Sequence, residues 1–160
     1  MHGMFLLLIL IVAANGAPIL VRYILGERMS FPVDFYQNFF DEKRIFGNTK
    51  TWTGLISIPV ASITAAWILS IELKVGILVG LGVMIGDLFS SFVKRRFGIK
   101  ESSMVIGLDQ IPESLFPLLM VQDILGFSVQ HVALAVVAFI IFELLVSRLL
   151  YWMHIRKQPY

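Results

Sequence analysis

One apolar stretch of the sequence contains an acidic residue and runs directly into three basic ones. Asp87 lies within residues 75–93, and Lys-Arg-Arg follows at positions 94–96. A carboxylate inside a bilayer-spanning segment costs roughly 2.5 to 3.5 kcal/mol on insertion scales, so its presence indicates a function. In a helix, Asp87, Ser91 and Lys94 would share one face, because they are spaced at i, i+4 and i+7. One wall of this helix would then present an acid, a hydroxyl and an amine, a set suited to a metal ion and to phosphates.

The composition places the chain among integral membrane proteins. Of its 160 residues, 58% are hydrophobic and the mean hydropathy is +0.83, whereas about 45 to 50% is usual in soluble domains. The net charge of +2 does not indicate nucleic-acid binding, because the basic residues fall between apolar runs and form no stripe with interleaved aromatics. The chain has no cysteine, which excludes disulfides, zinc–thiolate sites and thiol nucleophiles.

Five apolar stretches are candidates for transmembrane helices. Crossing the hydrocarbon layer takes about 17 to 25 residues, and the stretches that we expect to do so are 4–25, 55–71, 75–93, 108–127 and 130–152. The fourth is the weakest, because prolines and acidic residues interrupt it. The apolar segments leave no room for a separate soluble domain, so we expect an all-α membrane protein with one domain covering residues 1–160.

Two pairs of glycines in the third stretch predict close helix packing. Gly76 and Gly80 are four residues apart, as are Gly82 and Gly86. In membrane helices this spacing lets a neighbouring backbone approach closely. The glycines at 80–86 do not form a dinucleotide-binding motif, since the spacing has one residue too many and no strand precedes it.

The distribution of basic residues predicts the orientation in the membrane. With the N-terminus outside, twelve of the thirteen Lys and Arg residues lie on the inner side, and only Lys74 lies outside. The inner group includes Arg28, Arg156 and Lys157. Residues 1–17 also resemble a secretory signal, but no basic residue precedes Arg22, so we expect this segment to be retained as a membrane helix. We therefore expect a cytoplasmic C-terminus, a location in the cell membrane, and chemistry that faces the cytoplasm.

Three polar blocks would meet at this inner face. They are residues 47–54, which open the second stretch, 86–96, which close the third, and 108–110, which open the fourth. Asp87 and Asp109 are the candidate ligands of a divalent ion, since Mg²⁺ is typically bound by one or two carboxylates together with substrate phosphates and waters. The cations that would neutralise a polyphosphate are Lys50, Lys94, Arg95 and Arg96. Each feature also has a purely structural explanation when it is considered alone. The basic run 94–96 could mark the cytoplasmic end of a membrane helix under the positive-inside rule. Asp87 could belong to a buried structural ion pair.

The same blocks resemble a known family. The chain is similar to the CDP-archaeol synthases, compact relatives of the phosphatidate cytidylyltransferases, in Ala14-Asn15 and in residues 47–54 (GNTKTWTG), 86–98 (GDLFSSFVKRRFG) and 108–110 (LDQ). The resemblance implies five membrane helices and a Mg²⁺-dependent cytidylyltransferase of phospholipid biosynthesis. In that reaction a lipid phosphate attacks the α-phosphorus of CTP, and pyrophosphate leaves.

The resemblance also implies roles for individual residues. Asp87 and Asp109 would bind the metal and, with Lys94, carry the catalysis. Contacts to phosphates would come from Lys50, Ser91, Lys94, Arg95 and Arg96. The residues that would help to seat the nucleotide are Asn48, Trp52 and Gln110. The implied partners are CTP, a lipid phosphate and the surrounding membrane lipids.

The chain departs from the family pattern at two places. Thr53 stands where the family has an arginine, which removes one phosphate contact. Ile111-Pro112-Glu113 follows the third block in place of Leu-Asp-Phe, so a second aspartate is missing and Glu113 is its nearest acidic replacement, one position later. The choice between an ether and an ester lipid as acceptor therefore stays open.

A different class of function is a transporter or a lipid-binding subunit. Asp87, Glu143 and Arg148 would then form an ion pathway, although a charge such as Glu143 within a span usually pairs toward the bundle interior. A transporter needs polar residues distributed through the depth of the bilayer, whereas here they cluster toward one face. The long aspartate-rich motif of CDP-alcohol phosphotransferases is also absent. The sequence thus favours the cytidylyltransferase.

Overall fold

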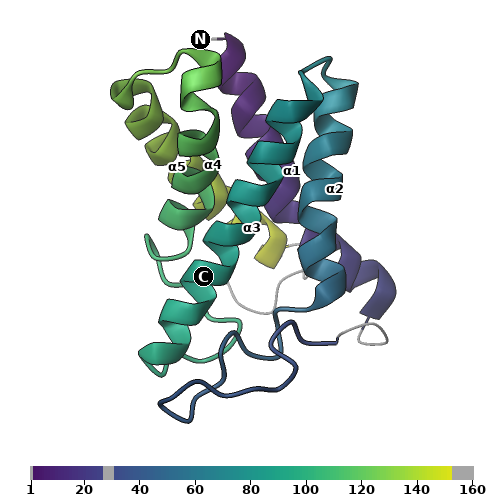
Figure 1. Ribbon diagram of the computed structural model, residues 1–160, viewed down its shortest axis with the longest axis vertical. Helices are drawn as coiled ribbons and strands as arrows, with labels where there is room; N and C mark the ends of the chain where they lie inside the picture. Colours follow the sequence, from purple (N-terminus) through teal and green to yellow (C-terminus); the bar gives the residue numbers. More distant parts are fainter. Residues whose placement is uncertain (1, 27–30, 153–160) are drawn as a thin grey trace.

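Five helices form the part of the chain that the structure, a computed structural model, describes, namely residues 2–26 and 31–152. The helices are α1 (His2–Leu25), α2 (Trp52–Ile68), α3 (Leu73–Arg96), α4 (Gln110–Leu125) and α5 (Val129–Trp152), and they gather in one bundle (Figure 1). Within the described residues β-structure is limited to two isolated bridges in the loop between α1 and α2. The prediction of an all-α protein with five helices is confirmed. Three basic residues of the orientation prediction, Arg28, Arg156 and Lys157, lie outside the described residues.

Three of the helices are long and apolar enough to cross a membrane. They are α1 over residues 3–25, α3 over its whole length and α5 over residues 129–149. Half of the apolar segment of α3 is buried by the other helices, against 28% of the segments in α1 and α5. Helix α3 is therefore the central element. Helix α2 is apolar but has 17 residues, and α4 has 16 residues with acidic residues and prolines among them.

Helix α2 begins earlier than the apolar pattern predicts because of a capping residue. Thr51 has an extended backbone, and its hydroxyl accepts a hydrogen bond from the backbone N–H of Gly54 at 3.3 Å. This contact satisfies one of the amide groups that a helix leaves without a partner in its first turn. The cap fixes the end of the preceding loop, and with it Lys50, at the start of the helix.

The core is built from apolar side chains of all five helices. The largest fully buried ones are Leu7, Leu10, Ile11, Ile58, Val79, Val83, Leu118, Val121 and Phe139. All but Ile58, which lies near the loop end of α2, occupy the middle of the bundle and the end away from the long loops. Apolar packing therefore holds the bundle together mainly at that end.

The glycines of α3 bring two neighbouring helices into close contact, as their spacing predicts. A Cβ atom at Gly80 would lie 2.6 Å from Cα of Pro59 in α2, and one at Gly82 would lie 2.4 Å from Cα of Pro117 in α4. Both distances are far below van der Waals contact. Helix α3 is thus packed between α2 and α4 with backbone against backbone.

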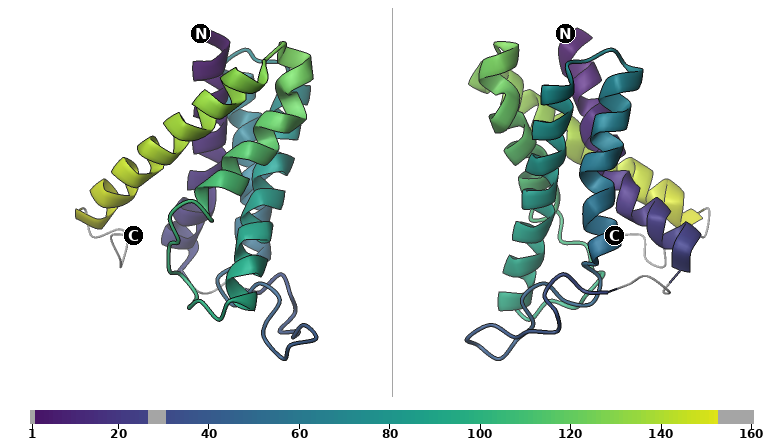
Figure 2. Two further views of the ribbon diagram at one scale, coloured as in Figure 1. Left: turned by 90° about the vertical axis from the view of Figure 1, so that its left-hand side faces the viewer. Right: turned by 45° about the vertical axis from the view of Figure 1, so that its right-hand side comes forward.

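The two long loops lie at the same end of the bundle. Loop 31–51 passes below the C-terminal end of α3, and loop 97–109 runs from that end back alongside the bundle to α4 (Figure 2). Toward this end α1 diverges from α3, and α5 leans away from the other helices (Figure 2). The bundle is therefore tight at one end and spread at the other.

The close contact at Gly82 gives a test of the packing. We expect Gly82→Ala to lower the free energy of unfolding by about 1 to 3 kcal/mol, because a methyl group there overlaps the backbone of Pro117. Gly16→Ala in α1 is the matched control, since no atom lies within 4 Å of the added Cβ. Thermal unfolding in detergent measures both. Equal stability of the two variants would contradict the close contact.

Candidate active site

The spread end of the bundle encloses a polar cavity of about 550 Å³. All five helices and both long loops line it. Among the described residues its charged lining consists of four acidic and four basic side chains, namely Asp87, Asp109, Glu113, Glu143, Arg22, Lys50, Lys94 and Arg95. The two signs balance, so the cavity offers cations to an anionic ligand and carboxylates to a metal ion without a large net charge.

One face of α3 forms a wall of the cavity. Asp87, Ser91 and Lys94 all line it, as the helical spacing predicts. Ser91 is 3% exposed and Lys94 is 9% exposed. Each of these polar groups is therefore withdrawn from bulk water and has to find partners within the protein or in a ligand.

Lys50 reaches across the cavity to Asp87. It comes from the end of loop 31–51, and its ammonium group donates a hydrogen bond to Oδ1 of Asp87. Burial lowers the pKa of Lys50, but the nearby carboxylates of Asp87, Glu113 and Asp109 raise it by more, so the net pKa lies above the ordinary value of 10.5. The ammonium group is therefore charged throughout the neutral range.

A second lysine and carboxylate pair closes the other side of the cavity. Nζ of Lys94 lies 2.7 Å from Oδ1 of Asp109 and donates to the carbonyl of Ser103 at 3.2 Å. The other carboxylate oxygen of Asp109 accepts from the backbone N–H of Val105 at 2.9 Å. Both side chains of the pair are about a tenth exposed. Loop 97–109 is thus fastened to the end of α3 through the same groups that face the cavity.

The contact between α3 and α4 brings three carboxylates to one cavity. A Cβ at Gly86 would lie 2.4 Å from the carbonyl oxygen of Pro112, so the residue after it, Asp87, is held against the first turn of α4. Asp109 and Glu113 are four residues apart and lie on one face of that turn. Glu113, one position after the place of the aspartate that this chain lacks, is 8% exposed and lines the cavity.

The carboxylates are suited to a metal ion that brings other ligands with it. Within the described ranges no group of three Asp, Glu or His side chains is close enough to form a metal site by itself. Asp87 and Asp109 still present hard oxygen donors to one cavity. This donor set fits Mg²⁺, which is usually bound by one or two carboxylates with phosphates and waters completing its shell.

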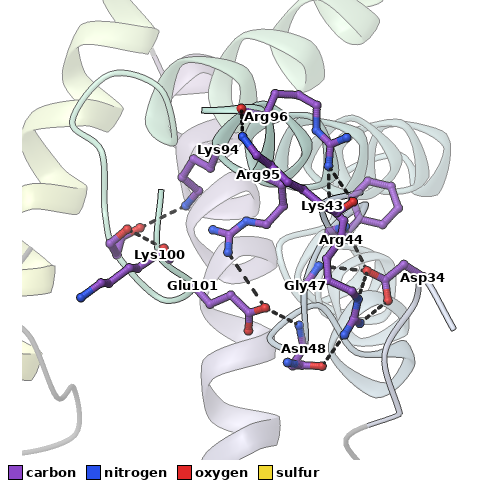
Figure 3. A network of polar contacts seen from close by, with 12 residues as sticks. Asp34, Lys43, Arg44, Gly47, Asn48, Lys94, Arg95, Arg96, Lys100 and Glu101 are labelled. Atoms are coloured by element: carbon purple, nitrogen blue, oxygen red, sulfur yellow. Dashed lines mark hydrogen bonds and ion pairs between the residues drawn. The ribbon is translucent and has the colours of Figure 1, made fainter. Parts of the chain in front are cut away.

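Arg95 links the cavity to both long loops. It lines the cavity, and its guanidinium lies 4.0 Å from Oε1 of Glu101 in loop 97–109. The same oxygen of Glu101 accepts a hydrogen bond at 3.1 Å from the backbone N–H of Asn48 in loop 31–51 (Figure 3). Arg95 is therefore within reach of a ligand while tied to a carboxylate that joins the loops.

Two sequence candidates have structural contacts away from the cavity. Arg96 donates to Oδ1 of Asp41 at 2.5 Å and to the backbone carbonyls of Lys43 and Arg44, so it attaches loop 31–51 to the end of α3 (Figure 3). The side chain of Gln110 is fully buried, and its Oε1 accepts from the backbone N–H of Gly107 at 2.7 Å.

Two further candidates for nucleotide contacts lie beside the main cavity. Asn48 lines a smaller cavity of about 250 Å³, which adjoins the first at Arg22 and Thr49. Trp52 is 39% exposed and packs on Phe35, with 5.9 Å between ring centroids. The structure thus brings together Lys50, Asp87, Ser91, Lys94, Arg95 and Asp109, but not Asn48, Trp52, Arg96 and Gln110.

Two cavity residues were not placed in the site from the sequence. In the sequence, Arg22 served only to predict the orientation in the membrane. It follows Asn15 by seven residues and so lies on the same face of α1, where both residues line the cavity. Glu143 belonged to the rival ion pathway. Its position at the cavity depends on how α5 crosses the bundle, and no local pattern in the sequence reports that crossing.

Comparisons with known proteins agree on one family. A model of the CarS-like CDP-archaeol synthase family matches residues 56–160. The CDP-archaeol synthase of Pyrococcus furiosus is 36% identical over 107 residues, which cover 61% of this chain and 60% of that protein. The enzyme of the same name from Saccharolobus solfataricus is 40% identical over 85 residues, which cover 50% of this chain and 51% of that protein. The match thus spans about half to three fifths of the length of these curated relatives.

A solved structure is also similar over most of its length. It is described as an intramembrane enzyme for archaeal membrane lipids biosynthesis, is 26% identical in sequence and has a TM-score of 0.69. The alignment covers 88% of this chain and 90% of that one. Together with the apolar helices, this similarity makes the chain a multi-pass membrane protein.

The raised pKa of Lys50 predicts slow reaction with amine reagents. The ammonium group is charged throughout the neutral range, and it loses its proton, together with the contribution of the pair to stability, only as the pH rises through the raised pKa of the folded state. At about pH 9 we therefore expect acetylation of Lys50 to be slower than that of exposed Lys74. Mass spectrometry of the labelled peptides measures both rates, and equal rates would contradict the ion pair.

Proposed function

The chain belongs to the CDP-archaeol synthase family, and from that premise we propose that it is a CTP-dependent cytidylyltransferase that converts a lipid phosphate to a CDP-lipid. The observation that carries the proposal is one cavity in a membrane bundle, in which acidic residues of α3 and α4 face basic residues of α3 and loop 31–51. Such a cavity matches an anionic nucleotide with its metal ion on one side and a lipid headgroup on the other.

The reaction exchanges one phosphoanhydride bond for another. An oxygen of the lipid phosphate attacks the α-phosphorus of CTP, the bond from that phosphorus to the bridging oxygen breaks, and pyrophosphate leaves with the electron pair. Catalysis of such transfers depends chiefly on alignment and on stabilising negative charge. Basic groups fixed around a buried cavity provide both.

In this proposal the phosphates bind to Lys50, Ser91, Lys94 and Arg95. The two lysines are held at the cavity by Asp87 and Asp109, so their side chains are already placed beside the groups that would bind the ligand. Asp87 and Asp109 would hold Mg²⁺. When bound, the ion supplies positive charge next to the phosphates.

The orientation and the location belong to the same proposal. Lys43, Lys50, Lys94 and Lys100 come from the loop end of the bundle, whereas Lys74 is at the opposite end of α3. By the positive-inside rule the loop end faces the cytoplasm, where CTP is available. We place the protein in the cell membrane, with its acceptor lipid approaching from the inner leaflet.

The cavity does not favour the transporter alternative. Its charged lining lies at the spread end of the bundle, while the other end is an apolar core. Glu143 and Arg148 both have interaction partners within the protein, which is the usual arrangement of charged residues in a membrane bundle.

Replacement of Asp87 tests the proposal directly. We expect Asp87→Asn to abolish the Mg²⁺-dependent transfer of labelled CTP to a lipid phosphate, because the amide removes one charged oxygen ligand. The assay offers ether-type and ester-type lipid phosphates in parallel, and the mass of the product identifies the acceptor. Turnover at the rate of the unmodified protein would contradict the role of Asp87, and inactivity of the unmodified protein toward every acceptor would contradict the proposed function.

Replacement of Lys94 separates binding from folding. We expect Lys94→Gln to raise the KM for CTP by about tenfold or more, since it removes a charged phosphate contact. Lys74→Gln is the control, because this lysine is exposed at the other end of the same helix. Thermal unfolding of both variants checks the fold. A KM for CTP in Lys94→Gln equal to that of the control would contradict a contact between Lys94 and the phosphates.

A further inference from the structure

Loop 31–51 is organised around one buried carboxylate, that of Asp34. The side chain is fully buried. It accepts hydrogen bonds from the backbone N–H groups of Tyr36 at 3.2 Å, Phe46 at 3.0 Å and Gly47 at 3.0 Å. Arg44 adds a bidentate contact, with Nη2 2.5 Å from Oδ1 and Nε 3.2 Å from Oδ2 (Figure 3). Burial raises the pKa of Asp34, but these donors lower it by more, so the group is ionised at neutral pH.

Apolar packing accounts for only part of the order of this loop, in which Phe39 packs on Phe92 of α3 with 5.2 Å between ring centroids. Three of its aromatic side chains, Phe31, Phe35 and Phe40, are 52%, 56% and 98% exposed. The contacts of Asp34 therefore act together with the contacts of Arg96 in defining the fold of residues 34–47. A carboxylate with several charged and backbone donors is a strong hydrogen-bonding centre.

The Asp34 network adjoins the backbone of Lys50. The N–H of Val33 donates to the carbonyl of Lys50 at 2.8 Å, and the N–H of Trp52 donates to the carbonyl of Phe31 at 3.0 Å. The residue next to Asp34 is thus paired with Lys50 itself. One residue, Val33, therefore connects Asp34 to the backbone of Lys50.

The turn that precedes Lys50 is held from a second side. Gly47 has a φ of +96°, and a Cβ there would lie 2.6 Å from Oε1 of Glu101. Glu101 also accepts from the backbone N–H of Asn48. With Asp34 bonded to the amide of Gly47, this turn is fixed between two carboxylates, and Lys50 follows three residues later.

We propose that Asp34 is a positioning residue, which holds the ammonium group of Lys50 at the cavity by fixing the turn and the backbone pairing of loop 31–51. The inference about Lys50 as a phosphate contact rests on the proposed function, whereas the positioning of its amine does not. Asp34 itself does not line the cavity, so its effect on a ligand passes through Lys50.

The first experiment measures the position of Lys50 without any nucleotide. In Asp34→Asn we expect acetylation of Lys50 to become about tenfold faster, because loss of hydrogen bonds to a charged group frees the loop, while acetylation of Lys94 stays unchanged. Asp41→Asn is the matched control, since Asp41 is an exposed acid of the same loop that contacts Arg96. An unchanged rate at Lys50, or the same increase in the control, overturns the proposal.

A second variant covers the case in which Asp34→Asn does not fold. Arg44→Gln removes the guanidinium from the same carboxylate and leaves its backbone donors in place. We expect Arg44→Gln also to make acetylation of Lys50 faster, but by a smaller factor than Asp34→Asn does. No change at Lys50 in the folded Arg44→Gln protein counts against Asp34.

A double-mutant cycle then tests the path through Lys50. We expect Asp34→Asn to raise the KM for CTP by about tenfold with less effect on kcat, and by less than about twofold when Lys50 is already alanine. Additive effects would show that Asp34 acts on stability alone and overturn its positioning role. If the unmodified protein forms no CDP-lipid, the proposed function fails, and the labelling rates still decide the role of Asp34.

Discussion

The spread end of this bundle depends on charges that neutralise one another where water is scarce. Lys50 pairs with Asp87, and Lys94 pairs with Asp109. Burying such pairs gains little stability, because the loss of hydration offsets most of their attraction, whereas removing one partner is costly. Their presence in an otherwise apolar bundle is therefore better explained by a ligand that uses both signs than by stability of the fold.

Close backbone packing places these charges. Gly82 and Gly86 allow α4 to approach α3 so closely that Asp87 meets the first turn of α4. Pro112 is tolerated there because the first residues of a helix have no intrahelical partner for their N–H groups. The same contact that fastens the two helices thus sets the separation of the carboxylates at the cavity.

The helices and one wall of the site could be predicted from the sequence because they follow from local patterns. Hydropathy gave all five helices, and the i, i+4, i+7 spacing put Asp87, Ser91 and Lys94 on the cavity. The glycine spacing predicted the close contacts of α3. Each of these features depends on residues within one or two turns of a helix.

The remaining features depend on how distant segments cross. The pairing of Lys50 with Asp87 follows from the path of loop 31–51, and the entry of Glu143 follows from the tilt of α5. The basic run 94–96 looks uniform in sequence, yet Lys94 and Arg95 face the cavity while Arg96 turns outward to loop 31–51. Arg95 and Arg96 are adjacent in the helix, and only the positions of the loops show which of them lines the cavity and which binds loop 31–51.

The most direct measurement is an experimental structure of the protein with CTP and Mn²⁺, in which anomalous scattering locates the metal ion. We expect the Mn²⁺ signal inside the cavity, within coordination distance of the carboxylates of Asp87 and Asp109 and of the CTP phosphates. A nucleotide bound elsewhere, or a metal ion that contacts neither carboxylate, would contradict the assignment of this cavity as the active site.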